Sequence, residues 1–225
     1  MAVHVAFTPE EAAPAAVGIV VDVLRATSTI AQALASGYER VLCCAEIGEA
    51  RALRSELADS LVGGERKAVR IEGFDVGASP REFLEPRAEA LILSTTNGTR
   101  AILETARRCD EVFLGSLLNL RAVAAAAGDQ DVLVVCAGFQ GAFALDDAYC
   151  AGRIVQLLDA ERTDAAIAAG LVAEAFPTAL AGLNARTYGP PGLEDDIIYC
   201  AQEDLLDAVP RYTGMVGAAA EIMLR

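Results

Sequence analysis

The sequence has little of several features on which whole classes of protein depend. It contains one histidine, His4, in 225 residues, and this scarcity disfavours hydrolases that pair a serine with a histidine. No uncharged apolar run reaches the roughly 18 residues of a membrane-spanning helix. The six cysteines form no CxxC pair and lie mostly in apolar runs, which favours buried, reduced thiols over metal ligands or nucleophiles.

Positive charge is also scarce, with 18 lysines and arginines against 32 aspartates and glutamates, for a formal net charge of −14. An acidic field of this size repels phosphate backbones, so we expect no nucleic-acid partner and no binding to anionic membranes. A small anionic substrate remains compatible with it if a divalent cation supplies local attraction. The first ten residues contain no basic region and no long apolar stretch, so we expect no signal peptide and a cytoplasmic location.

The chain does have a large apolar fraction, 54% of its residues, beside 22% charged residues. This balance excludes intrinsic disorder, and a chain of this size buries roughly 70% of its extended surface on folding. Short β-branched runs alternate with alanine-rich segments of helical period, which is the pattern of an α/β protein. We expect one domain over residues 1–225, a layered α/β/α fold whose mixed, largely parallel sheet is covered on both faces.

The expected elements follow from these runs. Strands are expected at Val3–Phe7, Val17–Val23, Arg40–Cys44, Ala90–Leu93, Glu111–Leu114 and Asp131–Cys136. Helices are expected at Thr29–Ser36, Gly48–Ala58, Thr99–Arg107, Asn119–Ala127 and Asp146–Leu158, with more helix from Asp164 onward. A Gly-Pro-Pro sequence at 189–191 interrupts that last region.

A weak internal repeat aligns VVDVLRATSTI with ALILSTTNGTR at an offset of about 70 positions. An internal duplication with halves near 17–60 and 88–128 explains it, and chance similarity between alanine- and leucine-rich segments explains it equally well. A duplication would place Arg25–Thr27 and Thr95–Gly98 at equivalent strand-to-helix turns. In open α/β sheets, ligands bind at such turns, at the carboxyl ends of the strands.

The first candidate site segment is VVDVLRATST, in which an expected strand ends at Asp22 and a helix follows. An aspartate at a strand end can hold a metal or act as a base, and Arg25 can bind phosphate through its guanidinium fork. The Thr27 hydroxyl and the amides of a helix N-terminus can bind anionic oxygens. The alternative is a capping threonine beside a solvated Arg–Asp pair.

The second candidate is the glycine-rich stretch LVGGERKAVRIEGFDVGASPRE. Dense glycine lets the backbone approach a ligand closely, and Glu65 and Asp75 offer the hard oxygen ligands that Mg²⁺ takes. We favour a functional role for Glu65, Arg66 and Asp75 over the alternative of a charged connecting loop. Ser79-Pro80-Arg81-Glu82 is a capping box with proline at the first helical position, which is a structural feature.

The third candidate is the turn TTNGT in LILSTTNGTRAIL, formed by Thr95, Thr96, Asn97, Gly98 and Thr99. Asn-Gly accommodates positive φ and exposes consecutive N–H groups, so the turn suits an anion at a helix start. It lacks the GxxxxGK(S/T) spacing of a nucleotide-triphosphate loop. A hydroxyl-rich capped turn without a ligand is the alternative.

The fourth candidate, VLVVCAGFQGAFALDDAYCAG, lacks the GxGxxG spacing of a dinucleotide site. Asp146 and Asp147 open the next helix, where interaction with the helix dipole explains them without a catalytic role. Cys136 ends a strand but has no nearby histidine in the sequence to activate it as a nucleophile. The acidic stretch 194–196 is also explained by helix capping.

Taken together, these segments resemble the 2-phosphosulfolactate phosphatase family. The pieces that carry the resemblance are VVDVLRATSTI, LVGGER, IEGFDVGASP, TTNGTRAI, LGSLLN, VVCAG, LDDAYCAG and DIIYCAQED. The resemblance implies an α/β fold of its own type and a cytoplasmic role in coenzyme M biosynthesis. It also implies Mg²⁺-dependent hydrolysis of 2-phosphosulfolactate to sulfolactate and phosphate. The chain departs from the family pattern at Ala78, where asparagine is expected, and at Phe139, where a small polar residue is commoner.

The hypothesis is that carboxylates among Asp22, Glu65 and Asp75 hold Mg²⁺, which bridges to a phosphate oxygen. Arg25, Arg66 and the Thr95–Thr99 turn would stabilise the charge that develops on the phosphoryl group. Asp22 is the best candidate for a base or a nucleophile, and direct attack by water and a phosphorylated aspartate both stay open.

Three alternatives stay open beside this hypothesis. One is a nucleotide- or cofactor-dependent enzyme with a mononucleotide site at the strand ends, although the missing GxGxxG and GxxxxGK(S/T) spacings count against it. A non-catalytic anion-binding protein would use the same turns, and a phosphatase of a different small phospho-acid would use the same chemistry. A homodimer is plausible for so alanine- and leucine-rich a chain, although no segment identifies an interface.

Overall fold

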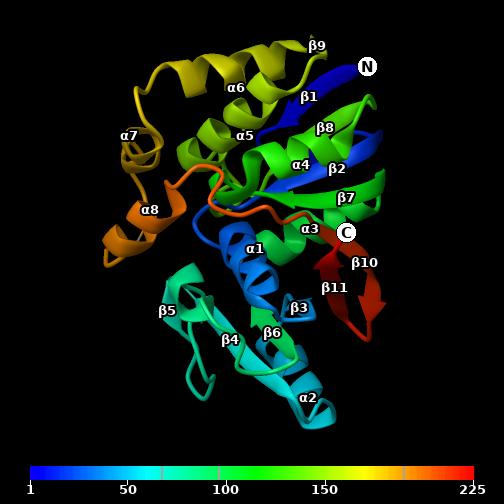
Figure 1. Ribbon diagram of the computed structural model, residues 1–225, viewed down its shortest axis with the longest axis vertical. Helices are drawn as coiled ribbons and strands as arrows, with labels where there is room; N and C mark the ends of the chain where they lie inside the picture. The colour runs from blue at the N-terminus through cyan, green and yellow to red at the C-terminus, as the bar shows by residue number, and fades with distance from the viewer. Residues whose placement is uncertain (67, 96, 190) are drawn as a thin grey trace.

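The computed structural model describes residues 1–225 except 67, 96 and 190, and it is an α/β structure (Figure 1). The strands are β1 (Ala2–Ala6), β2 (Ala15–Val21), β3 (Arg40–Cys44), β4 (Ser60–Arg66), β5 (Val69–Arg70), β6 (Ala90–Ser94), β7 (Cys109–Gly115), β8 (Val132–Cys136), β9 (Glu161–Arg162), β10 (Pro210–Val216) and β11 (Ala219–Leu224). The helices are α1 (Ala26–Ser36), α2 (Ile47–Glu56), α3 (Gly98–Ala106), α4 (Leu120–Ala127), α5 (Leu145–Leu157), α6 (Asp164–Glu174), α7 (Ala179–Asn184) and α8 (Glu194–Cys200). None of these helices is long and apolar enough to cross a membrane within the described residues.

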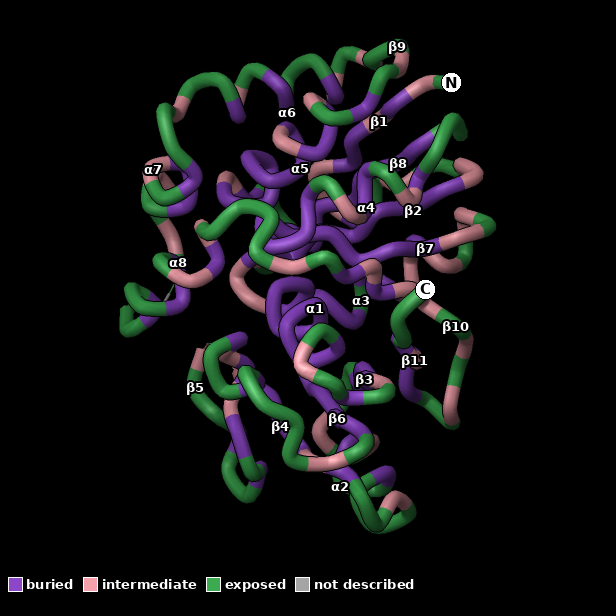
Figure 2. The backbone as a smooth tube through the Cα atoms, in the orientation of Figure 1, coloured by how far each residue is buried: buried purple, intermediate pink, exposed green. Residues whose placement is uncertain are grey.

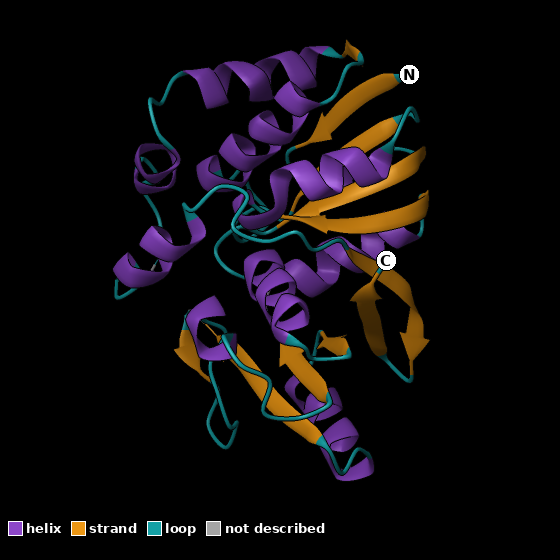
Figure 3. Cartoon of the chain, viewed as in Figure 1, coloured by secondary structure: helices purple, strands orange, loops and turns teal. Residues whose placement is uncertain are grey.

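The strands of the described residues form one mixed sheet in the order β5-β4-β6-β3-β11-β10-β7-β2-β8-β1-β9. β4, β6 and β3 are parallel neighbours, and so are β7, β2, β8, β1 and β9. The antiparallel hairpin β10–β11 joins these two groups, because β11 pairs with β3 and β10 pairs with β7 (Figure 3). The expected α/β fold with a largely parallel sheet is confirmed.

Helices cover both faces of the sheet. This explains why the residues of β3 are almost all apolar. Val41 and Cys43 pack into the core under α1, whereas Leu42 and Cys44 pack into the core under α2. A strand with a core on each face has no side that favours polar residues, so alternation disappears from its sequence. Figure 2 shows the same continuous burial along the central strands.

Two crossovers bring the candidate turns together. The chain runs from β2 through α1 to β3, and from β6 through α3 to β7, while β2 pairs with β7 and β3 pairs with β6. The N-termini of α1 and α3 therefore meet, and a Cβ at Gly98 would lie 2.4 Å from the Cβ of Ala26. Only glycine permits this approach. The internal duplication itself stays a prediction.

Two stretches differ from the expected elements. The segment from Asp164 contains α6, α7 and α8, but Pro210–Leu224 forms the hairpin β10–β11 instead of helix. The hairpin is defined by pairing with strands distant in sequence, which leaves no local signal. The glycine-rich stretch begins with β4, where a Cβ at Gly64 would lie 2.5 Å from the Ser94 carbonyl oxygen of β6. Glycine at this position therefore permits close packing of β4 against β6, in addition to any role in the loop.

The six cysteines are free thiols, five of them buried and Cys109 half-buried. Burial raises the pKa of Cys44 to about 12 and that of Cys136 well above its ordinary value. A thiol with so high a pKa is a weak nucleophile at neutral pH. The interpretation as buried free thiols is confirmed for five of the six cysteines, and Cys109 differs from it because it is half-buried.

Candidate active site

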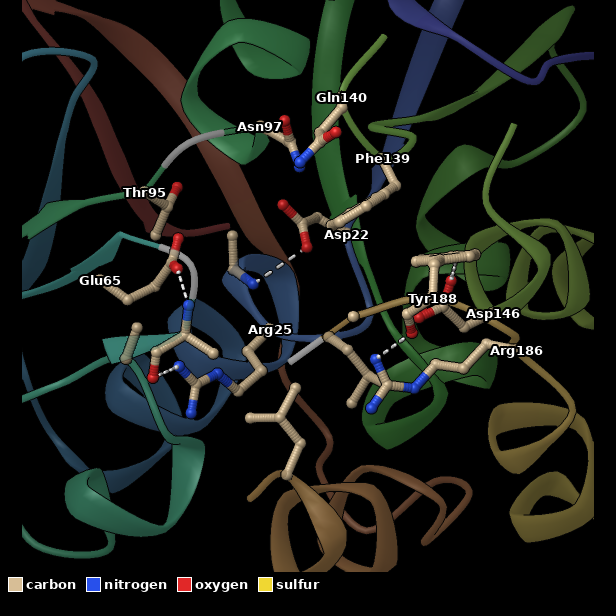
Figure 4. Close-up of a pocket in the computed structure, with 16 residues that line it drawn as sticks. Asp22, Arg25, Glu65, Thr95, Asn97, Phe139, Gln140, Asp146, Arg186 and Tyr188 are labelled. Carbon is tan, nitrogen blue, oxygen red and sulfur yellow. Dashed lines mark hydrogen bonds between the residues drawn. The ribbon is translucent and has the colours of Figure 1, made fainter. Parts of the chain in front are cut away.

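A cavity of about 300 Å³ opens where the carboxyl ends of β2, β4, β6 and β8 converge (Figure 4). The residues that line it come from six segments of the chain, namely Asp22, Leu24, Arg25, Ala26, Glu65, Ala68, Ala78, Thr95, Asn97, Phe139, Gln140, Asp146, Arg186, Tyr188, Gly189 and Leu193. This is the place in an α/β sheet at which ligands are expected. Five of the predicted site residues line the cavity, namely Asp22, Arg25, Glu65, Thr95 and Asn97.

Asp22 follows β2 and is 9% exposed. Its backbone N–H donates to the Thr27 hydroxyl at 3.1 Å, and that hydroxyl donates to the Asp22 carbonyl at 3.0 Å. The Ala26 amide at the start of α1 donates to the Asp22 carboxylate at 3.4 Å. Burial, followed by the nearby carboxylates of Asp146 and Glu65, raises the pKa of Asp22 to about 7. Asp22 is therefore a fixed carboxyl group that can hold or release a proton near neutral pH.

Asp146 and Asp147, at the start of α5, do more than interact with the helix dipole. The Asp147 carboxylate accepts the amide hydrogens of Val23 at 2.9 Å and Gly138 at 3.0 Å, which ties the loops after β2 and β8 together. Asp146 faces the cavity and accepts a hydrogen bond from the Tyr188 hydroxyl. Burial raises the pKa of both carboxyl groups, and the charge of Asp146 raises the pKa of Asp147 further.

Glu65 lies across the cavity from Asp146, with Asp22 between them (Figure 4). Its carboxylate accepts the Ala68 amide hydrogen at 2.6 Å. Arg66, the next residue, does not line the cavity. Its guanidinium donates to the Ala45 carbonyl at 2.9 Å and to the Ser94 hydroxyl at 3.1 Å, which ties β4 to its neighbours.

Arg25 reaches the cavity from a buried ion pair. Its Nη1 lies 2.6 Å from Oδ2 of Asp196, and the two side chains are 9% and 6% exposed. The Ser79 hydroxyl donates to the other Asp196 oxygen at 2.5 Å. The interpretation of residues 194–196 as helix capping therefore omits the contact of Asp196 with Arg25. The sequence offers no signal for this contact, because the paired residues are separated by most of the chain.

The remaining predicted residues divide between the cavity and the surrounding structure. Thr95 and Asn97 line the cavity, whereas Thr96 lies outside the described residues. Thr27 and Thr99 are buried and bond to backbone carbonyls, Thr99 donating to that of Cys44 at 3.3 Å. Gly98 is where α3 approaches α1, as described above.

Asp75, predicted as a metal ligand, does not line the cavity. Its carboxylate accepts the Val62 amide hydrogen at 2.9 Å and lies 3.8 Å from the Arg54 guanidinium. These contacts fix the loop that follows β5 against β4. Of the three predicted ligands, the structure brings Asp22 and Glu65 together and leaves Asp75 elsewhere.

One wall of the cavity was not foreseen. Phe139 stacks on Tyr188, with ring centroids 4.6 Å apart, and Arg186 lies beside them. Residues 186–189 connect α7 to α8, a region where the sequence predicted only an interruption of helix. No local pattern indicates that this connection folds back onto the loop after β8.

The cavity offers two carboxylates that fit Mg²⁺ if water and substrate complete its coordination. Among the described side chains, no three of His, Cys, Asp or Glu are placed to hold a metal ion together. Mg²⁺ commonly needs only one or two protein carboxylates, because waters and substrate phosphate complete its octahedron. Asp22 and Glu65 supply two carboxylates on one cavity. Burial is the main cause of the raised pKa of Asp22, and the charges of Asp146 and Glu65, which a cation would offset, raise it further.

Comparison with known proteins matches most of this chain to one family. The family profile described as 2-phosphosulpholactate phosphatase matches residues 4–215. A protein of Gloeobacter violaceus is 40% identical over 228 residues, covering 95% of this chain and 96% of its own. A protein of Pseudothermotoga lettingae is 39% identical over 215 residues, covering 92% and 94%. A protein of Clostridium acetobutylicum is 39% identical over 211 residues, covering 87% and 88%. Each of the three is named a probable 2-phosphosulfolactate phosphatase.

Proposed function

The chain belongs to the 2-phosphosulfolactate phosphatase family, and we propose that it hydrolyses 2-phosphosulfolactate to sulfolactate and inorganic phosphate. The observation that carries this proposal is a single cavity lined by both a buried carboxyl group, Asp22, and an arginine, Arg25. One group can activate or replace the attacking water, and the other can stabilise the charge of the transferred phosphoryl group. Together they are what phosphoryl transfer to water requires of a protein.

We propose a role for each of these side chains, supported by its surroundings. Arg25 is held in place by Asp196, so its guanidinium does not have to be ordered when substrate binds. Thr95 and Asn97 offer a hydroxyl and an amide to phosphoryl oxygens from the start of α3. Asp22 acts as general base toward water or as the nucleophile.

We propose Mg²⁺ as the cofactor, held by Asp22 and Glu65. When bound, it neutralises negative charge on the phosphate oxygens. The main support for Mg²⁺ is the chemistry of the two carboxylates, because Mg²⁺ takes carboxylate oxygens in preference to nitrogen or sulfur ligands. Family membership supports Mg²⁺ less directly. The same reasoning explains how a chain with a net charge of −14 attracts an anionic substrate.

We also propose that the enzyme works in the cytoplasm, within coenzyme M biosynthesis. Its six free thiols fit a reducing compartment. A homodimer stays a prediction.

The experiment is to measure phosphate release from 2-phosphosulfolactate and 2-phospholactate, with Mg²⁺ and with EDTA. We expect release that requires the metal and that is faster for the sulfonated ester. Preference for phospholactate would reassign the substrate to a different small phospho-acid. Tight binding of sulfolactate or phosphate with no release from either ester would show an anion-binding protein instead.

A further inference from the structure

Two arginines line the cavity, and they differ in whether a carboxylate of the protein pairs with their charge. Arg25 forms a buried ion pair with Asp196, so its positive charge is matched within the protein. Arg186 is half-buried and forms no ion pair with a described carboxylate, and its Nη1 donates to the backbone carbonyl of Tyr188 at 3.2 Å. The Asp146 carboxyl group lies near Arg186 without pairing with it: burial raises the pKa of Asp146, and the charge of Arg186 offsets part of that rise.

The two groups also lie on different sides of the cavity. Arg25 lies on the same side as Glu65, whereas Arg186 lies beside Tyr188 and Asp146 (Figure 4). Arg25 belongs to the turn after Asp22 and is the arginine assigned above, in the proposed function, to the phosphoryl group. An anionic ligand that fills the cavity would present its remaining negative charge toward Arg186.

The segment that carries Arg186 is anchored at its far end. The Tyr188 hydroxyl donates to the Asp146 carboxylate, and its ring stacks on Phe139. This anchoring holds the backbone carbonyl to which Arg186 donates. Other nitrogens of the guanidinium remain to donate to a ligand, since the group has five N–H donors.

We propose that Arg186 binds the acidic group of the substrate that is not transferred, a sulfonate or a carboxylate, and so determines which phosphate esters the enzyme accepts. The proposal rests on the proposed function for the identity of the ester. A guanidinium suits this role because its planar fork binds two oxygens of such a group at once. The stacked rings of Phe139 and Tyr188 line the cavity on the same side.

The test compares the wild type with Arg186→Gln, which removes the charge and keeps hydrogen-bonding capacity. Binding of sulfolactate and of inorganic phosphate is measured by calorimetry. Loss of a charge-assisted hydrogen bond should weaken sulfolactate binding roughly 10-fold to 100-fold. Phosphate binding should change less than about two-fold, and Arg186→Lys should recover part of the sulfolactate affinity.

A matched control is Arg107→Gln, which removes one positive charge from an arginine on the surface that is 66% exposed. It should leave both affinities unchanged, and thermal melts of all variants show whether they fold. Kinetics with 2-phosphosulfolactate and 2-phospholactate then identify which acidic group of the substrate Arg186 binds. An increase in KM for both esters in Arg186→Gln indicates the carboxylate, and an increase for the sulfonated ester alone indicates the sulfonate.

Equal weakening of sulfolactate and phosphate, or no weakening of either, would overturn the role of Arg186. Failure of the proposed function gives a different result, because wild-type enzyme would then release no phosphate from either ester. The binding comparison and the turnover of the wild type are therefore separate readouts.

Discussion

The buried pair of Arg25 and Asp196 gives the sharpest prediction about how the site is held. At an effective dielectric constant of about 20, unit charges 2.6 Å apart attract by about 6 kcal/mol. Removing the two ions from water costs several kcal/mol each, so the intact pair adds little net stability. Asp196→Asn removes one ion and leaves the other buried, which should lower the free energy of unfolding by about 3 to 5 kcal/mol.

The neighbouring residue provides a matched control. Asp195 pairs with Arg81 at 3.0 Å, but these side chains are 71% and 46% exposed. Asp195→Asn should therefore cost less than about 1 kcal/mol. In urea unfolding, Asp196→Asn should lower the midpoint at constant slope, and its melting temperature should fall by at least about 6 °C.

The double variant Arg25→Met with Asp196→Leu separates stability from catalysis. Replacing both ions with apolar side chains should recover most of the stability that Asp196→Asn loses. It should not recover phosphate release, because the guanidinium is gone. If Asp196→Asn unfolds within 1 kcal/mol of the wild type, or the double variant loses as much stability as the single one, the reasoning about this pair is wrong.

Four further predictions follow from the same geometry. The pKa of Asp22 is raised from 3.8 to about 7 by burial, so the folded chain binds this proton more tightly than the unfolded chain, and the stability it contributes is lost as the pH rises between these values. Asp22→Asn should therefore melt higher than the wild type at pH 8 although it releases phosphate at least about 100-fold more slowly, and a lower melting temperature would contradict this. Gly98→Ala should reduce both turnover and melting temperature, because its Cβ would lie 2.4 Å from that of Ala26 and 2.9 Å from Oδ2 of Asp22; unchanged activity would show that the approach is not required. Mg²⁺ should raise the melting temperature of the wild type in thermal-shift measurements and leave that of Asp22→Asn unchanged. Iodoacetamide should leave activity intact in native enzyme, because burial raises the pKa of the thiols, and mass spectrometry showing rapid labelling of Cys136 would contradict it.

The fold could be predicted largely because its strands are buried on both faces. Arg40–Cys44 matches β3 at both ends, and the apolar run of β8 is found to within one residue. Such runs carry their signal locally. The hairpin β10–β11 could not be found in this way, because its strands are defined by β3 and β7, more than 90 residues away in the chain.

The candidate site was predictable where its residues follow strands. Asp22, Glu65 and Thr95 end β2, β4 and β6 or lie beside those ends, and parallel strands bring such residues to one edge. Residue type alone could not separate Glu65, which faces the cavity, from Arg66, which faces away. Adjacent residues of a strand point to opposite faces, and the register of β4 was not predicted.

The sequence could not predict the contacts of three further residues, Arg186, Tyr188 and Asp196, for another reason. They come from connections and a short helix that fold back over the sheet, and their partners are Asp146 and Arg25. Contacts of this kind depend on where the chain returns in space. Three-dimensional structure was needed to show that the cavity has a second wall.

The central claim is that the protein hydrolyses a phosphate ester in the cavity that Asp22 lines. The measurement that tests it most directly is phosphate release from 2-phosphosulfolactate by the wild type and by Asp22→Asn, in Mg²⁺, with folding of both verified by thermal melts. The account predicts equal amounts of phosphate and sulfolactate from the wild type and at least a 100-fold lower rate from the folded variant, since a positioned acid–base group contributes about 10²- to 10⁴-fold. Turnover in Asp22→Asn close to that of the wild type would contradict it.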